Sequence, residues 1–251
     1  MRALRIILIV TVILGGLFVI ADRVAVGFAE NKAADRIKST EGLASTPDVS
    51  IEGFPFLTQV VGGTLDDVKI GIKEYEASTG GGTGGGGGTG TIRIDDLNAE
   101  MHGVSFNGDY SSATANSASG SATVAYAALL KAVKPALTPV GPGVTAEVVG
   151  LSDGGNGKIK VSVKVAVGGS ALPEPVSVLS SVTVVGGNTV RVHADSLPEV
   201  GVALAENRVR AITDFEQKID RLPGGIQLDK VEAAANGVNI SVKGSDVKLV
   251  G

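Results

Sequence analysis

Few side chains in this sequence are of the types that carry out catalysis. The two histidines, His102 and His193, each lie in a strand-like segment, where a lone histidine is usually solvent-facing or hydrogen-bonded. A zinc site would need two or three further nitrogen or sulfur ligands, and the chain has no cysteine. The lack of cysteine also excludes disulfides, thiol nucleophiles and lipidation of a cysteine. We therefore expect neither a histidine general base nor a metal site.

One serine lies in a motif that resembles a nucleophile elbow. Gly150-Leu151-Ser152-Asp153-Gly154 fits the pattern G-x-S-x-G, which requires a strand before the serine and a helix after it. Here a glycine-rich turn and then a strand follow, so we interpret Ser152 as a hairpin residue. An esterase built on Ser152 is the third-ranked hypothesis. The turn from Asp153 to Gly157 has the composition of a weak calcium site, but a β-turn explains it sufficiently.

The remaining charged residues do not favour an enzyme or a nucleic-acid-binding protein. The pairs Asp66-Asp67 and Asp95-Asp96 are adjacent on strand-like segments, and adjacent side chains on a strand point to opposite faces. Neither pair alone is then expected to hold one metal or one glycosidic bond. The net charge is −4 and no basic block is present, which argues against phosphate-backbone binding. We predict no catalytic residue, no cofactor and no nucleic-acid partner.

The first segment has the composition of an export signal or a membrane anchor. Arg2 and Arg5 precede an apolar run from Ile6 to Ala21, and Asp22-Arg23 ends it. Such a run is typical of a cleaved signal, an uncleaved anchor or, less often, a buried core helix. We favour an anchor with its N-terminus inside. Residues 1–22 are then the anchor or signal, and residues 23–251 form a domain on the extracytoplasmic, periplasmic side of the membrane.

Periodicity predicts an α+β domain. Apolar residues alternate in about eight or nine segments that are typical of antiparallel strands, most clearly in Ile159–Val167. Helical spacing is found at 24–37, at 126–137 and at 202–222. Residues 78–90 are almost pure glycine and threonine, which predicts a flexible loop. Without β–α alternation, a parallel sheet is not expected.

The cluster Gly53-Phe54-Pro55-Phe56-Leu57 stands out because it holds two of only six phenylalanines. It follows a strand-like segment directly and surrounds a proline. Two interpretations remain open and are compatible with each other. One is a core plug or strand corner, and the other is an apolar lip or groove wall that contacts acyl chains.

Three parts of the chain together resemble a known family. The first is Ala21-Asp22-Arg23-Val24-Ala25 with Ala29-Glu30, directly after the apolar run. The second, and most specific, is Val49-x-Ile51-x-Gly53-Phe54-Pro55-Phe56-Leu57-x-Gln59-x-x-Gly62, followed by Val68-x-Ile70. The third is Leu222-Pro223-Gly224-Gly225-Ile226 with Val231, and then Gly237-Val238-x-Ile240-x-Val242-x-Gly244. In these strings the chain resembles the LmeA family of actinobacterial phospholipid-binding proteins over nearly its whole length.

The resemblance implies a fold and a role. The fold is half of a tubular lipid-binding (TULIP-like) module, in which a curved antiparallel sheet wraps around a long amphipathic helix, here preceded by an N-terminal apolar helix. The role is in envelope lipid or lipoglycan assembly, such as lipomannan elongation. The glycine run at 79–90 departs from the family pattern as an insertion, and the scarcity of aromatic residues elsewhere requires any groove to be aliphatic.

We therefore predict non-enzymatic binding of a phospholipid or glycolipid in an apolar groove next to a membrane. Transfer of the lipid is left open, as is the oligomeric state. The alternative is a structural or interaction domain of the envelope with a dry, packed core. Each candidate contact is individually more often a core residue than a ligand contact. The candidates are Phe54, Phe56, Leu57, Tyr126, Leu129, Leu130, Val133, Val209, Ile212, Phe215 and Ile219.

Overall fold

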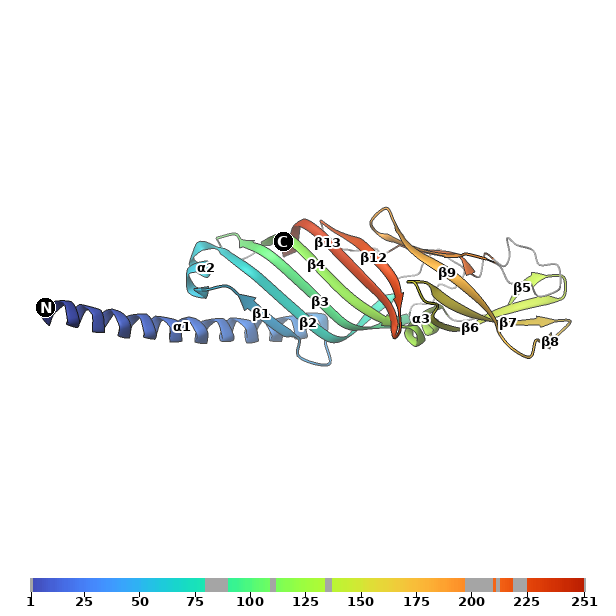
Figure 1. The fold of residues 1–251 in the computed structure, drawn as a ribbon, viewed down its shortest axis with the longest axis horizontal. Coiled ribbons are helices and arrows are strands. Elements are labelled where there is room, and N and C mark those ends of the chain that lie inside the picture. Colours follow the sequence, from blue (N-terminus) through green and yellow to red (C-terminus); the bar gives the residue numbers. More distant parts are fainter. Residues whose placement is uncertain are drawn as a thin grey trace.

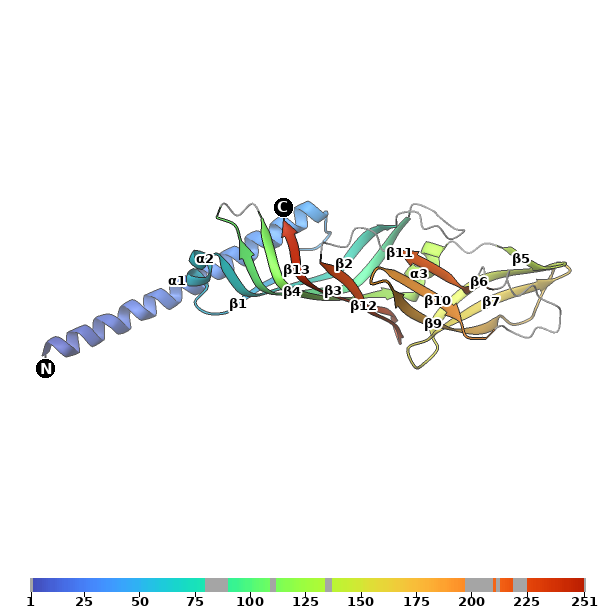
Figure 2. The ribbon, with the colours of Figure 1, turned by 90° about the horizontal axis from the view of Figure 1, so that it is seen from above.

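The computed structural model describes residues 2–79, 90–108, 112–133, 137–196, 210, 213–218 and 225–250. These residues form an elongated molecule in which two antiparallel sheets follow one another along the long axis (Figure 1). Helix α1 (Arg2–Glu41) enters at one end, and its N-terminal part projects away from both sheets (Figure 2). The short helices α2 (Phe56–Gly62) and α3 (Tyr126–Val133) lie at the outer end of the first sheet and near the junction of the two sheets.

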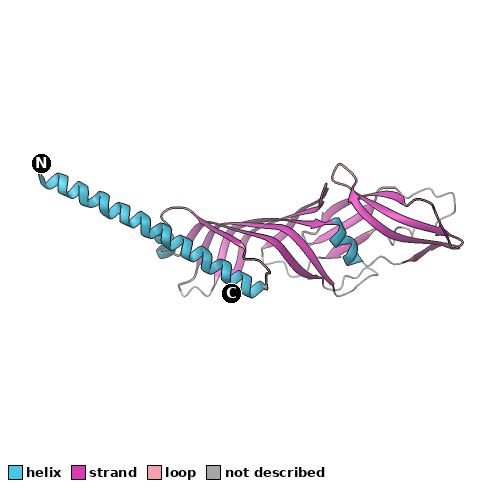
Figure 3. Cartoon of the chain, turned by 90° about the horizontal axis from the view of Figure 1, so that it is seen from below, coloured by secondary structure: helices cyan, strands magenta, loops and turns pink. Residues whose placement is uncertain are grey.

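The first sheet has six strands and is visibly curved (Figure 3). Its strand order is β1-β2-β3-β4-β13-β12, and each neighbouring pair is antiparallel. The strands in this order are β1 (Asp48–Glu52), β2 (Thr64–Thr79), β3 (Gly90–Phe106), β4 (Ala113–Ala125), β13 (Gly237–Val250) and β12 (Ile226–Ala234).

The second sheet has seven strands in the order β11-β10-β9-β7-β6-β5, with β8 paired to β7. Its central strand β7 shows the alternation that the sequence predicts, since Ile159, Val161, Val163 and Val165 are buried and Lys160 and Lys164 are exposed. The strands are β11 (Phe215–Lys218), β10 (Thr189–Ala194), β9 (Val176–Val185), β7 (Ile159–Val167), β6 (Val144–Asp153), β5 (Thr138–Gly141) and β8 (Ser170–Ala171).

The apolar segment and the amphipathic segment near the N-terminus form one continuous helix, α1. Its first part is exposed throughout, whereas Val26 and Ala34 in its second part are buried. Val26 belongs to a core with Phe56, Leu65 and Met101, which joins α1 and α2 to the first sheet. The predicted class is therefore confirmed: an N-terminal apolar helix leads into curled antiparallel sheets, and the first sheet packs on the amphipathic part of that helix.

A second core joins the two sheets. Val161 and Val178 of the second sheet pack in one cluster with Val231 and Val238 of the first. Strand β12 also makes backbone contacts across the junction, because the Ala233 N–H donates to the Gly157 carbonyl at 3.2 Å and the Leu228 N–H to the Gly187 carbonyl at 2.7 Å. The junction is therefore packed and hydrogen-bonded.

Two details of the predicted helices are wrong. Residues 215–218, placed in a helix at 202–222, form strand β11, which pairs with β10 from Thr189 to Val192. Pairing with an existing sheet edge overrides a local helical pattern of this length. Leu137, placed on the helix at 126–137, lies beyond α3 and is 68 % exposed.

Two other predictions fall largely outside the described residues. They are most of the predicted helix at 202–222 and residues 80–89 of the predicted glycine-rich loop. Strand β2 ends before this loop at Thr79, and β3 begins after it at Gly90.

Candidate functional site

The first sheet has one apolar and one polar face. Neighbouring residues on a strand alternate between faces, and paired residues on adjacent strands share a face. One row of paired residues crosses five strands with apolar or glycine positions only: Ile70, Ala99, Gly120, Val242 and Leu228. The adjacent row on the opposite face is polar throughout: Lys69, Glu100, Ser119, Lys243 and Gln227.

Helix α1 covers one part of the apolar face. Ala113, Ala115 and Ala118 of β4 are buried in the same core as Val26 of α1. Ala115 has no exposed surface. Because these side chains are small, a helix can approach the sheet closely here. This part of the apolar face is therefore occupied by the protein itself.

Further along the sheet, the apolar face keeps accessible surface. The residues concerned are all half-buried, and we call them the apolar strip: Ile70, Leu97, Ala99, Gly120, Ala122, Ile240 and Val242. Ile70 packs against the core beneath α1, and Ile240 packs against the core at the sheet junction. The strip therefore lies between the two cores.

The strip has small residues in its middle and larger ones at its sides. Ala99, Gly120 and Ala122 are flanked by Ile70 on β2 and Val242 on β13. A Cβ at Gly120 would lie 3.0 Å from Val242 Cγ2 and 3.1 Å from the Asn98 carbonyl oxygen. Both contacts are tighter than ordinary van der Waals separation, so the backbone is close-packed at this point.

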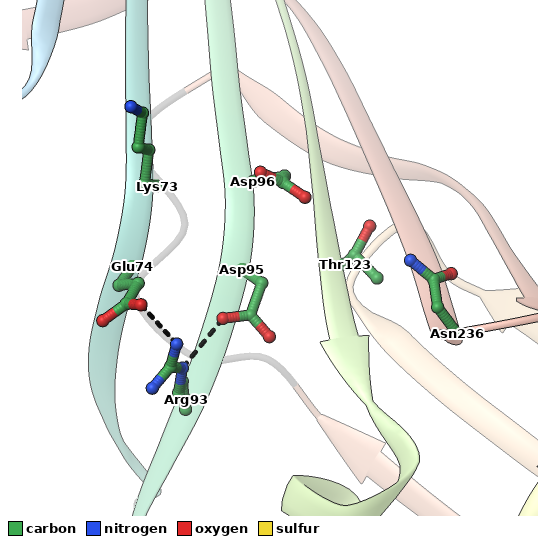
Figure 4. Close-up of a pocket in the computed structure, with 7 residues that line it drawn as sticks. All are labelled: Lys73, Glu74, Arg93, Asp95, Asp96, Thr123 and Asn236. Atoms are coloured by element: carbon green, nitrogen blue, oxygen red, sulfur yellow. Dashed lines mark hydrogen bonds and ion pairs between the residues drawn. The ribbon is translucent and has the colours of Figure 1, made fainter.

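A pocket of about 480 Å³ opens on the other face of the sheet. Thr123 belongs to the polar face of β4 and pairs with Asp95, which in turn pairs with Glu74. Figure 4 shows Arg93 between the two carboxylates, with its Nε 2.9 Å from Asp95 Oδ1. This pocket is charged and faces away from the apolar strip, so it is not the apolar groove expected from the sequence.

Asp95 and Asp96 both line this pocket (Figure 4), although adjacent strand residues were expected to point apart. Asp96 has a φ of 49°, and this left-handed conformation interrupts the alternation of the strand.

A second ion pair lies on the same polar face, where Lys69 Nζ is 2.8 Å from Glu52 Oε1. The hydrogen bond and the negative charge of Glu52 raise the pKa of Lys69. These are solvent-facing ion pairs.

The other candidate catalytic side chains lie on strands as well. Ser152 lies within β6 opposite Lys160, and a turn and β7 follow it. His102 Nδ1 pairs with Asp67 on the polar face, and His193 Nδ1 lies 2.7 Å from Asp214 Oδ2. The two histidine side chains are 51 % and 55 % exposed. The two histidines are thus solvent-facing, Ser152 is half-buried, and the three residues lie on three different strands.

The phenylalanine cluster forms a corner between β1 and β2. Gly53 has a φ of 99°, and a Cβ there would lie only 2.5 Å from Gln59 Nε2. Gln59 Oε1 in turn accepts the Asp66 N–H at 2.8 Å. Positive φ and the lack of space both require glycine at this position. The string Gly53 to Gln59 is therefore explained by the structure of this corner.

Members of this cluster differ in their surroundings. Phe56 is buried and Leu57 packs against the same core beneath α1, as the core interpretation predicts. Phe54, in contrast, is 58 % exposed. The guanidinium of Arg23 lies 5.3 Å from the centre of its ring, within the range of a cation–π contact.

Helix α3 lies at the sheet junction, far from the phenylalanine cluster. Tyr126 and Leu129 pack against the junction core, and the Tyr126 hydroxyl donates to the Ala234 carbonyl at 2.9 Å. Burial, together with the charge of Asp153, raises the pKa of Tyr126. Leu130 is half-buried. The structure therefore does not bring the α3 candidates and the Phe54 candidates into one site.

The remaining candidates are incompletely described. Val133 ends α3 and Phe215 begins β11 opposite Val192, but their side chains lie outside the described structure. Val209, Ile212 and Ile219 lie outside the described residues.

The sequence did not predict the apolar strip. Its central strand β4 reads ATANSASGSATVA and has few of the branched residues that indicate a strand. The only available signal was the alternation of alanine or glycine with serine.

The comparisons with known proteins agree with this architecture. A family model described as LmeA-like phospholipid-binding matches residues 20–243, which include the phenylalanine corner and every residue of the apolar strip. No curated protein and no solved structure matches the chain. On the extent of this match, the chain belongs to the LmeA-like phospholipid-binding family.

Proposed function

We propose that this protein binds a phospholipid or glycolipid without catalysing a reaction, and that it lays the acyl chains against the apolar strip. The observation that carries the proposal is the contrast between the two faces of the first sheet. Its polar face bears ion pairs, whereas its apolar face is only partly covered by α1 and leaves Leu97, Ala99 and Ala122 half-buried. Half-buried aliphatic side chains between two packed cores are a suitable surface for a hydrocarbon chain.

The energetics of lipid transfer favour this kind of surface. Each methylene removed from water contributes about 0.8 kcal/mol, so a diacyl lipid with roughly 30 methylenes needs on the order of 24 kcal/mol of compensating apolar contact. Hydrogen bonds and charges are needed only for the head group. Among the residues predicted from the sequence, one is exposed and four are half-buried, and these five stay in the proposal: Phe54, Leu57, Tyr126, Leu129 and Leu130.

We also propose that α1 anchors the protein in a membrane. Its apolar part has a mean hydropathy of 2.7 and is not buried against the rest of the chain. Arg2 and Arg5 precede the run, which favours an N-terminus on the cytoplasmic side and a domain on the extracytoplasmic side. A domain held there is in a position to take up lipid for transfer or for envelope assembly.

The test is to identify lipid that stays with the purified protein. The full chain is purified in a detergent that does not resemble a phospholipid, and the bound lipid is measured by native mass spectrometry and by solvent extraction. We expect phospholipid or glycolipid to be recovered, and a fluorescent phospholipid to exchange into the protein. Recovery of no lipid, together with no uptake of the fluorescent lipid, would contradict the proposal and favour a structural domain with a dry core.

A further inference from the structure

Four large apolar side chains are exposed at the end of the domain from which the apolar part of α1 projects. Val24 and Phe28 of α1 are 67 % and 68 % exposed, Phe54 is 58 % exposed and Val61 of α2 is 90 % exposed. We call these four residues the base patch. Figures 1 and 2 both place α2 at the end of the first sheet from which α1 projects.

The base patch continues the apolar surface of the anchor. Ile20, Val24 and Phe28 are spaced four residues apart, so they lie on one side of α1, and all three are exposed. Phe54 is held next to α1 by Arg23, whose guanidinium lies over its ring. No change of chain direction separates the anchor from the patch, because α1 is continuous from Arg2 to Glu41.

The anchor by itself is short for a bilayer. At about 1.5 Å per residue, Ile6–Ala21 is roughly 24 Å long, whereas a bilayer has a hydrocarbon core of about 30 Å. Val24 and Phe28 extend the apolar side of the helix by roughly two turns beyond Ala21. This extension supplies the missing length only if the base of the domain reaches the lipid.

The carboxylate closest to the apolar run is shielded by its own contacts. Asp22 is the acidic residue nearest the apolar run, and its side chain is 0 % exposed. Its Oδ2 lies 2.6 Å from Arg23, and its Oδ1 accepts the Leu57 N–H at 2.8 Å. The carboxylate is thus shielded, while Arg23 keeps a 49 % exposed side chain that is suited to lipid phosphates.

We propose that the base patch inserts into the head-group region of the bilayer that α1 spans, so that the domain rests on the lipid surface. Interfacial apolar side chains of this kind reach about 5–10 Å into the boundary between head groups and acyl chains. The inference rests on the anchor proposed above. It gives the domain a fixed base on the membrane, and the apolar strip lies further along the first sheet, beyond the part that α1 covers.

The chain has no cysteine, so single labels can be placed at will. Val61→Cys and Phe28→Cys are labelled with an environment-sensitive fluorophore in the full chain. Leu137→Cys and Leu179→Cys are matched controls, because both residues are exposed and lie in the part of the chain that forms the second sheet. The proteins are reconstituted into phosphatidylcholine vesicles containing phosphatidylglycerol, with or without phosphatidylcholine spin-labelled near the head of its acyl chain.

We expect the spin-labelled lipid to quench the labels at Val61 and Phe28 at least about threefold more than those at Leu137 and Leu179, as interfacial insertion requires. Equal quenching at all four positions would overturn the inference. A blue-shifted emission at Val61 without lipid quenching would also overturn it, because a second copy of the chain would then cover the patch. Extracted lipid without quenching at Val61 would leave the proposed lipid binding intact, whereas quenching without extracted lipid would contradict the lipid binding alone.

Discussion

The buried carboxylate of Asp22 accepts a hydrogen bond from the Leu57 N–H at 2.8 Å, and this contact joins the end of the apolar segment to the first turn of α2. The same carboxylate also accepts the Phe56 N–H, and its Oδ2 lies 2.6 Å from Arg23 Nη2. Asp22 is therefore charged. It belongs to α1, but its carboxylate caps the first turn of α2. The junction between the apolar part of α1 and the first sheet is thus built from specific contacts.

Removing this cap is expected to destabilise the domain. In Asp22→Ala the two N–H groups at the start of α2 lose their acceptor, and unsatisfied donors at a helix start are destabilising. We expect a thermal midpoint several degrees lower, measured on the full chain in detergent by circular dichroism. Asp35→Ala is the matched control, since Asp35 is an exposed carboxylate on the same helix. Equal midpoints for the two variants would contradict the role of Asp22.

An ion pair in the second sheet predicts a dependence of stability on pH. Lys158 Nζ lies 2.7 Å from Asp195 Oδ2, and Ser181 Oγ donates to Asp195 Oδ1 at 2.6 Å. These two hydrogen bonds lower the pKa of Asp195 below its ordinary value of 3.8. A carboxyl group with a lowered pKa contributes stability above its ordinary pKa and loses this contribution as the pH falls through its folded-state value.

Asp195→Asn is therefore expected to be less stable than the wild type by roughly 0.5–1 kcal/mol at neutral pH. The difference should narrow as the pH falls below 3.8, because protonation removes the charge in the wild type. Urea unfolding at a series of pH values measures this difference directly. A gap that stays constant down to the lowest pH at which the protein folds would refute the assignment.

The sequence predicted the elements whose pattern depends on large side chains. The alternation in Ile159–Val167 predicted β7, and the arginines and apolar run at the N-terminus predicted the start of α1. Such patterns are reliable because burial of large aliphatic side chains dominates the local choice of structure. The string from Gly53 to Gln59 was recognised by its resemblance to the family, and a strand corner was one of the two interpretations left open; the structure shows that Gly53 forms such a corner with a positive φ.

The apolar strip was not predictable in the same way. Ala99, Gly120 and Ala122 carry little hydrophobic signal, and they form one surface only because β3, β4 and β13 pair in register. The strand at Phe215–Lys218 was missed for a related reason, because its pairing partner is β10. Both features depend on contacts between segments distant in sequence, which local periodicity does not report.

Phe56 and Phe54 allow the core role of this corner to be tested separately from its proposed lipid role. Phe56 is 6 % exposed in the core beneath α1, so Phe56→Ala is expected to lower the free energy of unfolding by about 3–5 kcal/mol. Phe54→Ala removes an exposed ring and should change it by less than about 0.5 kcal/mol. Chemical denaturation of both variants checks this order. Similar losses for both would mean that Phe54 is also a core residue.

The apolar strip gives the sharpest test of lipid binding. Ala122→Leu adds a larger side chain to the middle of the strip, where it should displace about two methylenes of a bound acyl chain and weaken affinity roughly tenfold. Ser121→Leu adds the same side chain at the adjacent position, on the polar face of β4, and is expected to leave lipid affinity unchanged. Titration with a fluorescent phospholipid measures both variants, and thermal unfolding checks that both are folded. If Ser121→Leu weakened binding as much as Ala122→Leu, the acyl chains would not lie on the face of the sheet that bears Ala99, Gly120 and Ala122.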